Sequence, residues 1–366
     1  MKGDRYSELR RAMAESGLDA VALVPGSSFR RLFGRSFHSH ERPLCVLIPA
    51  SGTPAAALPH LEASAFATID FEGDVILWRD EEGFQGAFDA LGRARPGRAR
   101  IGVEGQVMRV FEEFALARAC PAAEIVDAGR AIAAIRLRKT AEEVARLREA
   151  IRISETAFAA TLAEVRVGMT EKRISAILLR NLFEAGAEAL SFHPIVAAGA
   201  NSAQPHAVAR PDYAIRPGDA LLFDFGASRA GYLADITRTV FVDFASDEDR
   251  ALYDTVLVAN EAGRAAVRPG LAAGALDDTV LGVLEASPFR DCIRHKTGHG
   301  LGLDVHEEPY IMRGSQVALA PGMVFTIEPG LYREDRIGVR IEDDVVVTET
   351  GCEVLTSFPR ELRIVG

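Results

Sequence analysis

Pro217-Gly218-Asp219-Ala220-Leu221-Leu222-Phe223-Asp224-Phe225-Gly226 is a stretch that the chain repeats weakly as Pro321-Gly322-Met323-Val324-Phe325-Thr326-Ile327-Glu328-Pro329-Gly330. In both copies Pro-Gly opens an apolar run that ends in a carboxylate and a glycine. Each copy then returns along a second apolar run that carries another acid, Asp235 or Glu342. Apolar runs joined by turn residues predict a β-hairpin. The repeat therefore predicts two pseudo-symmetric units of antiparallel sheet that face each other.

Facing units would bring the four acids of the repeat together, and these are Asp224, Asp235, Glu328 and Glu342. A carboxylate on a buried strand must be paired, protonated or bound to a metal ion. Salt bridges to Arg238 and Arg340 could account for two of the acids. Ordinary strand acids that face solvent are the other interpretation.

A histidine-rich segment lies between the two copies and contains His295, His299 and His306 among closely spaced glycines. Glycine allows the backbone to approach a ligand closely. Four carboxylates and one imidazole suit two hard or borderline divalent ions better than a thiolate site would. Two such ions can activate water and stabilise a tetrahedral oxyanion, so the pattern favours a dinuclear hydrolytic centre.

The first 132 residues differ from the rest in the pattern of their apolar and polar residues. Their periodicity predicts helices over 4–16, 84–91 and 110–119, and strands over 20–24, 44–48 and 75–78. Thr140 is followed three residues later by Glu143, a capping-box spacing that begins a long helix. We therefore expect a small α/β domain over residues 1–132 and a second domain over residues 133–366.

The composition limits the classes of protein to which the chain can belong. The chain has 366 residues, 48% apolar and 26% charged, which excludes a disordered chain, a collagen and a disulfide-rich mini-protein. The net charge of −10 argues against nucleic acid and against an anionic membrane surface as partners. No apolar run approaches the roughly 18 residues of a membrane helix. The four cysteines are scattered, and no apolar signal segment follows the N-terminus, so we expect reduced thiols and a cytoplasmic location.

With these residues in view, the chain resembles the pita-bread metallopeptidases, which include methionine aminopeptidase, aminopeptidase P and prolidase. The resemblance covers most of residues 140–366. It rests on Pro205-His206-Ala207, Asp224-Phe225-Gly226, Gly231-Tyr232-Leu233-Ala234-Asp235-Ile236-Thr237-Arg238-Thr239, Thr297-Gly298-His299-Gly300-Leu301-Gly302, Val305-His306-Glu307, Ile327-Glu328-Pro329-Gly330-Leu331-Tyr332 and Val339-Arg340-Ile341-Glu342. The first domain is similar to the creatinase-type domain of the Xaa-Pro branch. The resemblance implies an α/β protein: a small N-terminal creatinase-type domain, then a pita-bread domain with a curved, mainly antiparallel sheet, a pseudo-twofold repeat and covering helices.

The resemblance also implies roles for individual residues. The metal ligands would be Asp224, Asp235, His299, Glu328 and Glu342. Asp235 and Glu342 would bridge both ions, and Glu328 would also move a proton. His206 and His306 would hydrogen-bond the scissile carbonyl and the tetrahedral intermediate. His295 and Arg340 would line the substrate end, although Arg340 is equally well placed for a salt bridge to a ligand carboxylate.

The implied activity is hydrolysis of N-terminal Xaa-Pro bonds with two divalent ions, Mn²⁺ first and Co²⁺ or Zn²⁺ as alternatives. Because the chain is short after Leu362, we expect a preference for Xaa-Pro dipeptides. Aminopeptidase P, which accepts longer peptides, is the alternative. A non-catalytic pita-bread module and the metal-free creatinase fit less well, because all five ligands are present. The resemblance further implies a homodimer.

The segment Phe37-His38-Ser39-His40-Glu41-Arg42-Pro43 is rich in polar groups. It is either a solvated loop or a cover over a site, in the second case in the partner subunit of a dimer.

Overall fold

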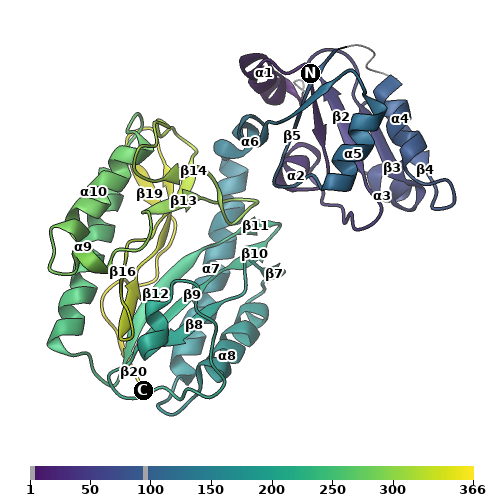
Figure 1. The fold of residues 1–366 in the computed structure, drawn as a ribbon. Helices are drawn as coiled ribbons and strands as arrows, with labels where there is room; N and C mark the ends of the chain where they lie inside the picture. The colour runs from purple at the N-terminus through teal and green to yellow at the C-terminus, as the bar shows by residue number, and fades with distance from the viewer. Residues whose placement is uncertain (1–4, 94–97) are drawn as a thin grey trace. The chain divides into compact units, whose positions relative to one another are not determined.

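The structure is a computed structural model in which residues 5–93 and 98–366 are described, and the chain forms two compact units, Met1–Arg136 and Leu137–Gly366 (Figure 1). The boundary expected between residues 132 and 133 falls within the last helix of the first unit, α6 (Gly129–Leu137). Ile132 and Ile135 of that helix belong to the core of the first unit, which explains why the division comes after them.

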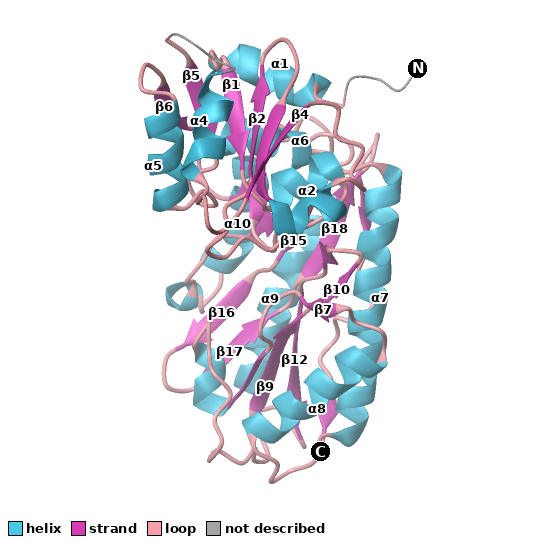
Figure 2. Cartoon of the chain, turned by 90° about the vertical axis from the view of Figure 1, so that its right-hand side faces the viewer, coloured by secondary structure: helices cyan, strands magenta, loops and turns pink. Residues whose placement is uncertain are grey.

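A six-stranded mixed sheet forms the centre of the N-terminal unit. Its strands are β1 (Ala20–Leu23), β2 (Cys45–Pro49), β3 (Ala55–Pro59), β4 (Asp74–Trp78), β5 (Arg100–Val103) and β6 (Glu124–Asp127), in the order β4-β3-β2-β1-β5-β6. The helices before α6 are α1 (Ser7–Ser16), α2 (Ser27–Phe33), α3 (Ala63–Phe66), α4 (Gln85–Arg93) and α5 (Val110–Ala119). Side chains alternate along β1, so Val21 and Leu23 pack against α1, α2 and α6 while Ala20 and Ala22 face α4 and α5 (Figure 2).

The elements expected in this unit are found within one or two residues of their predicted bounds, except that the first helix begins at Ser7. Residue 4, where it was expected to begin, lies outside the described residues. Strands β3, β5 and β6 were not expected, because short alanine-rich or charged strands carry a weak periodic signal.

The C-terminal unit contains two larger, mainly antiparallel sheets. The first, in the order β20-β12-β9-β8, consists of β8 (Ile195–Ala198), β9 (Ala220–Phe225), β12 (Ile236–Val242) and β20 (Ile364–Val365). The second, in the order β14-β13-β15-β18-β19, consists of β13 (Gly298–Gly300), β14 (Glu307–Ile311), β15 (Val324–Ile327), β18 (Asp343–Val347) and β19 (Cys352–Val354). The smaller strands are β7 (Ala189–Leu190), β10 (Ala227–Arg229), β11 (Tyr232–Leu233), β16 (Gly330–Arg333) and β17 (Ile337–Arg340).

The repeated stretches differ in one respect from the simple hairpins expected from the sequence. The expected antiparallel pairs exist, as β9 with β12 and β15 with β18. Between the strands of each pair, however, the chain leaves the sheet and forms a smaller hairpin, β10–β11 in the first copy and β16–β17 in the second. Each copy is thus a long hairpin whose end turns into a separate sheet, and the acids lie near that change of direction.

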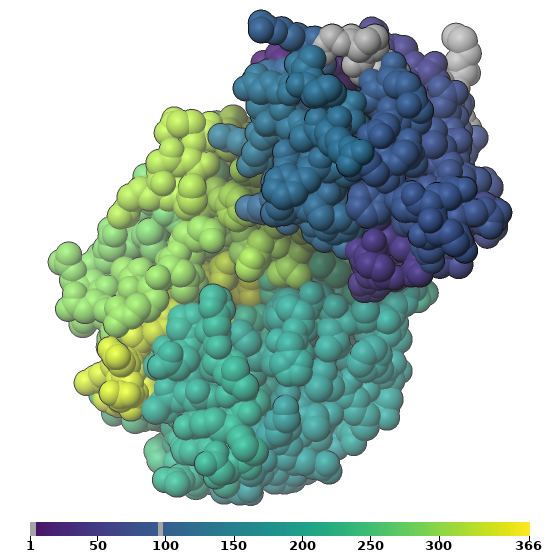
Figure 3. All heavy atoms as spheres, turned by 45° about the vertical axis from the view of Figure 1, so that its right-hand side comes forward, coloured from purple at the N-terminus to yellow at the C-terminus, as the bar shows by residue number. Residues whose placement is uncertain are grey.

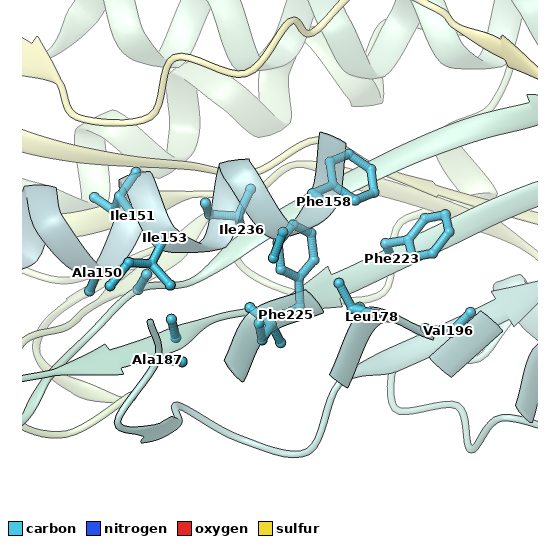
Figure 4. Packing of buried hydrophobic residues seen from close by; sticks show 14 of the residues in the cluster. Ala150, Ile151, Ile153, Phe158, Leu178, Ala187, Val196, Phe223, Phe225 and Ile236 are labelled. Atoms are coloured by element: carbon cyan, nitrogen blue, oxygen red, sulfur yellow. The ribbon is translucent and has the colours of Figure 1, made fainter. Parts of the chain in front are cut away.

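In the sequence, one pair of helices comes before β8 of the first larger sheet, and a second pair comes before β13 of the second. These helices are α7 (Ala141–Glu164), α8 (Glu171–Glu184), α9 (Asp247–Ala266) and α10 (Ala273–Glu285). The expected capping box is present, because Thr140 accepts a hydrogen bond from the Glu143 amide and the Glu143 carboxylate accepts one from the Thr140 amide. Phe158 of α7 packs against Phe223 and Phe225 of β9 (Figure 4). The packing of helices on the sheets fixes the strands that carry the acids. Within the described residues, none of the helices combines the length and the apolar character needed to cross a bilayer.

Candidate active site

The four acids of the repeat lie where the paired strands end. Asp224 is the penultimate residue of β9 and Asp235 directly precedes β12, whereas Glu328 directly follows β15 and Glu342 directly precedes β18. Several hydrogen bonds join the two copies. Among them, the Asp235 amide donates to Asp344 Oδ2 (3.2 Å), and the Glu342 amide donates to the carbonyl oxygen of Thr237 (3.1 Å). The pairing of the copies therefore places all four strand ends at one point.

The five residues with ligand-type side chains lie close together at that point. Asp224, Asp235 and Glu342 form one group whose oxygen atoms lie within 4.8 Å of one another, and His299, Glu328 and Glu342 form a second. Asp235 and His299 form a third group with His306. His299 Nε2 lies 3.3 Å from Glu328 Oε1 and 3.7 Å from Asp235 Oδ2. Glu342 belongs to the first and second groups and Asp235 to the first and third, so the arrangement has the form of adjoining sites with shared carboxylates.

Electrostatics at this point favour a bound cation. Burial, together with the negative charge of the neighbouring acids, raises the pKa of Asp235 and of Glu342 well above their usual values. Burial also raises the pKa of Glu328 to about 7, with Asp224 adding to the effect and Arg340 opposing it. Burial and the nearby His306 lower the pKa of His299 to about 3. A bound cation would relieve the repulsion among these buried acids and favour their ionised form, and a neutral imidazole is the form of histidine that binds a metal ion.

The donor set fits two divalent ions. Asp224 Oδ1 is buried without a hydrogen-bond partner in the described part of the chain, so it has an unused acceptor. Within the described residues the four carboxylates have one ion pair to an arginine, between Asp224 and Arg340, which leaves an excess of negative charge that two divalent ions would neutralise. Oxygen donors with one imidazole suit hard or borderline cations.

Arg340 is buried and held on three sides. Its Nη2 donates to Asp224 Oδ2 (2.5 Å), its Nη1 donates to Tyr332 Oη (2.5 Å), and its Nε donates to Thr237 Oγ1 (3.0 Å). Thr237 in turn donates to Glu342 Oε2 at 2.7 Å. Each Nη nitrogen of a guanidinium carries a second N–H, so Arg340 can pair with Asp224 and still donate into the cavity described below. The two interpretations of this residue are therefore compatible.

His295 uses both of its ring nitrogens inside the protein. Nδ1 lies 2.8 Å from the Lys296 carbonyl oxygen, and Nε2 lies 2.8 Å from Tyr332 Oη. Tyr332 accepts from Arg340, so its own proton points to His295 Nε2, and the His295 proton is on Nδ1. Burial and then the charge of Arg340 lower the pKa of His295 to about 4. Neutral His295 thus offers a ring face rather than an N–H to a ligand.

A cavity of about 720 Å³ opens onto the carboxylates, and its walls include His206, His295, His306 and Arg340. The C-terminal unit is visibly hollowed between its teal and yellow-green parts, with yellow segments at the bottom (Figure 3). The His306 ring lies edge-on to His299, with 4.1 Å between the ring centroids. Burial, and then the charge of Lys296, lower the pKa of His306, so a neutral imidazole with an N–H faces the cavity.

Four residues at this site were not assigned a role from the sequence. Lys296 lines the cavity with its ammonium 5.3 Å from the Tyr310 ring centroid. Thr237 and Tyr332 hold Arg340, and Asp344 holds the Asp235 amide. Lys296 has a sequence signal, since it lies between His295 and the glycine-rich turn. Thr237 and Tyr332 lie in the motifs that carry the family resemblance, whereas Asp344 lies outside them. The contacts of these three residues show what they hold.

The polar segment 37–43 in the N-terminal unit is fixed to its own unit. Arg42 pairs with Glu41 and Asp80, and Arg109 donates to the His40 carbonyl oxygen and to Ser39 Oγ. The His38 and His40 rings are stacked, 6.4 Å apart. Both interpretations of the segment therefore stand.

Comparison with known proteins places the chain in a family. Residues 145–349 match metallopeptidase family M24, and residues 5–138 match the creatinase/prolidase N-terminal domain. A protein of Lactobacillus helveticus named Xaa-Pro dipeptidase is 30% identical, over 98% of this chain and 98% of its own length.

Two solved structures are similar along almost the whole chain. The prolidase from Thermococcus sibiricus has a TM-score of 0.91 and 32% identity, over 100% of both chains. The X-Pro aminopeptidase from Thermotoga maritima has a TM-score of 0.81 and 31% identity, over 97% of this chain and 100% of its own. The expected creatinase-type and pita-bread domains are thereby confirmed. This chain belongs to metallopeptidase family M24 and is a metal-dependent hydrolase with a creatinase-type N-terminal domain.

Proposed function

We propose that the protein hydrolyses N-terminal Xaa-Pro bonds with two divalent metal ions and that it prefers Xaa-Pro dipeptides. One observation carries the proposal: side chains from both repeats converge as ligand groups that share Asp235 and Glu342, beside a cavity lined by three histidines besides His299. The names of the similar proteins, which are Xaa-Pro dipeptidase, prolidase and X-Pro aminopeptidase, support proline as the residue after the scissile bond.

In this proposal the ligands divide between two ions. The shared position of Glu342 supports its bridging role, and the 3.7 Å between Asp235 Oδ2 and His299 Nε2 supports that of Asp235. Asp224 would hold one ion, His299 and Glu328 the other, and Asp235 and Glu342 would bridge both. Two bound ions would make a water molecule acidic and polarise the scissile carbonyl group.

The remaining steps belong to the protein's own side chains. The water oxygen adds to the carbonyl carbon, and the Glu328 carboxylate accepts the proton that the water loses. His206 and His306 donate N–H groups to the oxygen on which negative charge develops. The C–N bond then breaks, and the proton passes from Glu328 to the prolyl nitrogen. Proline requires such a site because its amide nitrogen has no N–H through which an ordinary peptidase could hold it.

The preference for dipeptides requires recognition of a free carboxylate after proline. The cationic side chains in the cavity wall are Arg294, Lys296 and Arg340. We assign the recognition to Arg340, through the second N–H of each Nη nitrogen, and to the ammonium of Lys296. His295, whose nitrogens are both engaged, would contact the proline ring through its face. A buried site built for a charged group rejects an analogue that lacks it by as much as roughly 10⁴-fold, because its own donors then stay unpaired.

A rate comparison of Ala-Pro with Ala-Pro-Ala in the presence of Mn²⁺ tests the preference. We expect faster turnover of Ala-Pro, and a smaller ratio in Arg340→Ala. Because Arg340 also holds Asp224, metal content must be measured beside the rates. Equal or faster cleavage of Ala-Pro-Ala by the unaltered protein would replace the dipeptidase with an aminopeptidase P. No hydrolysis of either peptide with two ions bound would favour a non-catalytic peptide-binding module.

Three further features are proposed with the activity. Mn²⁺ is the first choice of metal because the donors are mostly carboxylate oxygens, and Co²⁺ or Zn²⁺ also suits them. A homodimer is proposed from the resemblance to the family. A cytoplasmic location is proposed because all four cysteines are free thiols. Metal analysis of protein purified without added metal and sedimentation of the full chain test the first two.

A further inference from the structure

The carboxylate of Glu171 is fully buried at the first residue of α8 and takes no part in the chemistry described above. Five N–H groups donate to it. They come from the Ala198 amide (2.8 Å), the Asn201 side chain (3.0 Å), the Arg210 amide (2.7 Å), and Arg210 Nε (3.1 Å) and Nη2 (2.7 Å). A buried carboxylate with this many donors is a rigid anchor, since its charge is stabilised only while all of them stay in place.

These donors lie at both ends of one segment. Ala198 ends β8, and Arg210 lies twelve residues later, so the Glu171 carboxylate closes residues 198–210 into a loop. Arg210 Nη2 also donates to the Ala198 carbonyl oxygen at 3.0 Å, and Asn201 spans the loop to the Val208 carbonyl oxygen at 3.1 Å. The loop therefore has a fixed base.

A second contact fixes the same loop to the strand that carries Arg340. The Gly338 amide of β17 donates to Ser202 Oγ at 2.8 Å. A side chain at Gly338 would meet the Ser202 carbonyl oxygen at 1.9 Å, so only glycine permits this approach. Gln204, Pro205 and His206, between the two anchors, line the cavity.

We propose that Glu171 and Arg210 are positioning residues that hold the His206 imidazole at the reacting carbonyl group. The inference rests on the proposed function, in which His206 donates to the developing oxyanion. Such a donor contributes only when it is held in place before the reaction, and a displacement of about 1 Å can cost roughly 100-fold in rate. A buried ion pair gives little net stability over apolar packing but does fix geometry, which is what a loop bearing a donor requires.

Double-mutant kinetics test the proposal in the full-length protein with Ala-Pro and Mn²⁺. Glu171→Gln keeps the size of the side chain and removes its charge, and we expect it to lower kcat roughly 10-fold to 100-fold. KM should change less, and two ions should remain bound. In a His206→Ala background the same substitution should lower kcat by less than about twofold, because the donor that it positions is already gone. Arg210→Lys keeps the charge and removes the planar fork, so it should behave in the same way if Glu171→Gln does not fold.

Glu143→Gln is the matched control, since Glu143 is also a buried carboxylate at a helix N-terminus and lies outside the cavity wall. It should lower the melting temperature without altering kcat per folded molecule. Equal losses from Glu171→Gln in both backgrounds, or loss of a metal ion, would overturn the inference while leaving the role of His206 intact. Full activity of His206→Ala alone would refute the proposed role of His206 and the inference with it.

Discussion

His299 and His306 touch each other at the candidate site, and we predict that replacing them has different consequences. His299 is 4% exposed and its Nε2 faces two carboxylates, Glu328 and Asp235. The His306 ring is more exposed. One of its ring nitrogens also lies within 4.8 Å of a ring nitrogen of His299 and of a carboxylate oxygen of Asp235. Distance alone would therefore permit either imidazole to bind a metal ion. Because acids enclose His299, we propose His299 as the ligand and His306 as the donor to the oxyanion.

The expected magnitudes follow from these surroundings. His306→Ala removes one N–H donor from the cavity wall, and loss of such a donor typically costs about 10²–10³ in kcat, or roughly 3–4 kcal/mol of transition-state stabilisation. Both ions should stay bound, because the carboxylates and His299 are untouched. His299→Ala removes the one imidazole of the ligand set and leaves Glu328 without its neighbour. It should lose one of the two ions and with it nearly all activity.

The assay is metal analysis after gel filtration, together with kcat for Ala-Pro measured at saturating Mn²⁺. His60→Ala, at an exposed position in the N-terminal unit, serves as the control and should retain both ions and full kcat. Thermal unfolding of all three variants separates loss of activity from loss of fold. Two ions in His299→Ala would show that His299 is not a ligand. One ion in His306→Ala would show that His306 is a ligand, and either result would refute the assignment.

Chelation should abolish hydrolysis and Mn²⁺ or Co²⁺ should restore it, whereas Asp235→Asn should stay inactive with either metal; full activity of metal-free Asp235→Asn would end the dinuclear hypothesis. Lys139→Met should lower the free energy of unfolding by about 3–5 kcal/mol in a denaturant titration, because it takes the ammonium away from the buried Glu307 carboxylate, 2.6 Å distant; a change below about 1 kcal/mol would contradict this, and Lys139→Arg should recover part of the loss. If the segment 37–43 covers a site in a dimer, His38→Ala and Arg42→Ala should raise KM at constant metal content, and unchanged kinetics for both would support a solvated loop.

Much of the site could be predicted because the types of its residues and their spacing in the sequence indicate its chemistry. Asp224 and Glu328 occupy the same place in two copies of one pattern, and this equivalence is enough to indicate a shared role. The capping box at Thr140 could also be predicted, since it depends on Thr140 and Glu143, which are three residues apart in the sequence. The inner hairpins β10–β11 and β16–β17 were missed because a change of sheet within an apolar run leaves no periodic signal.

The partners of the site residues could not be predicted, because they come from distant parts of the chain. Arg340 contacts Asp224 and Thr237, which are more than 100 residues away, and the same pattern in sequence is compatible with a free arginine. His295 was expected to line the substrate end of the site. In the structure both ring nitrogens of His295 are hydrogen-bonded, one to Lys296 and one to Tyr332. Because Tyr332 accepts a hydrogen bond from Arg340, it donates to His295 Nε2, and this fixes the tautomer of His295.

The sequence by itself determined which side chains are available: the repeated acids, the histidines and the local signals that begin helices and strands. These are properties of neighbouring residues, and local conformational preference is enough to express them. Only the tertiary structure decided which acids share a ligand group, which nitrogens are already bonded, and that Glu171 closes the loop carrying His206. Hydrogen bonds and ion pairs act over a few ångströms, so their partners are set by how the two repeats pack against each other, and sequence separation carries no information about that distance.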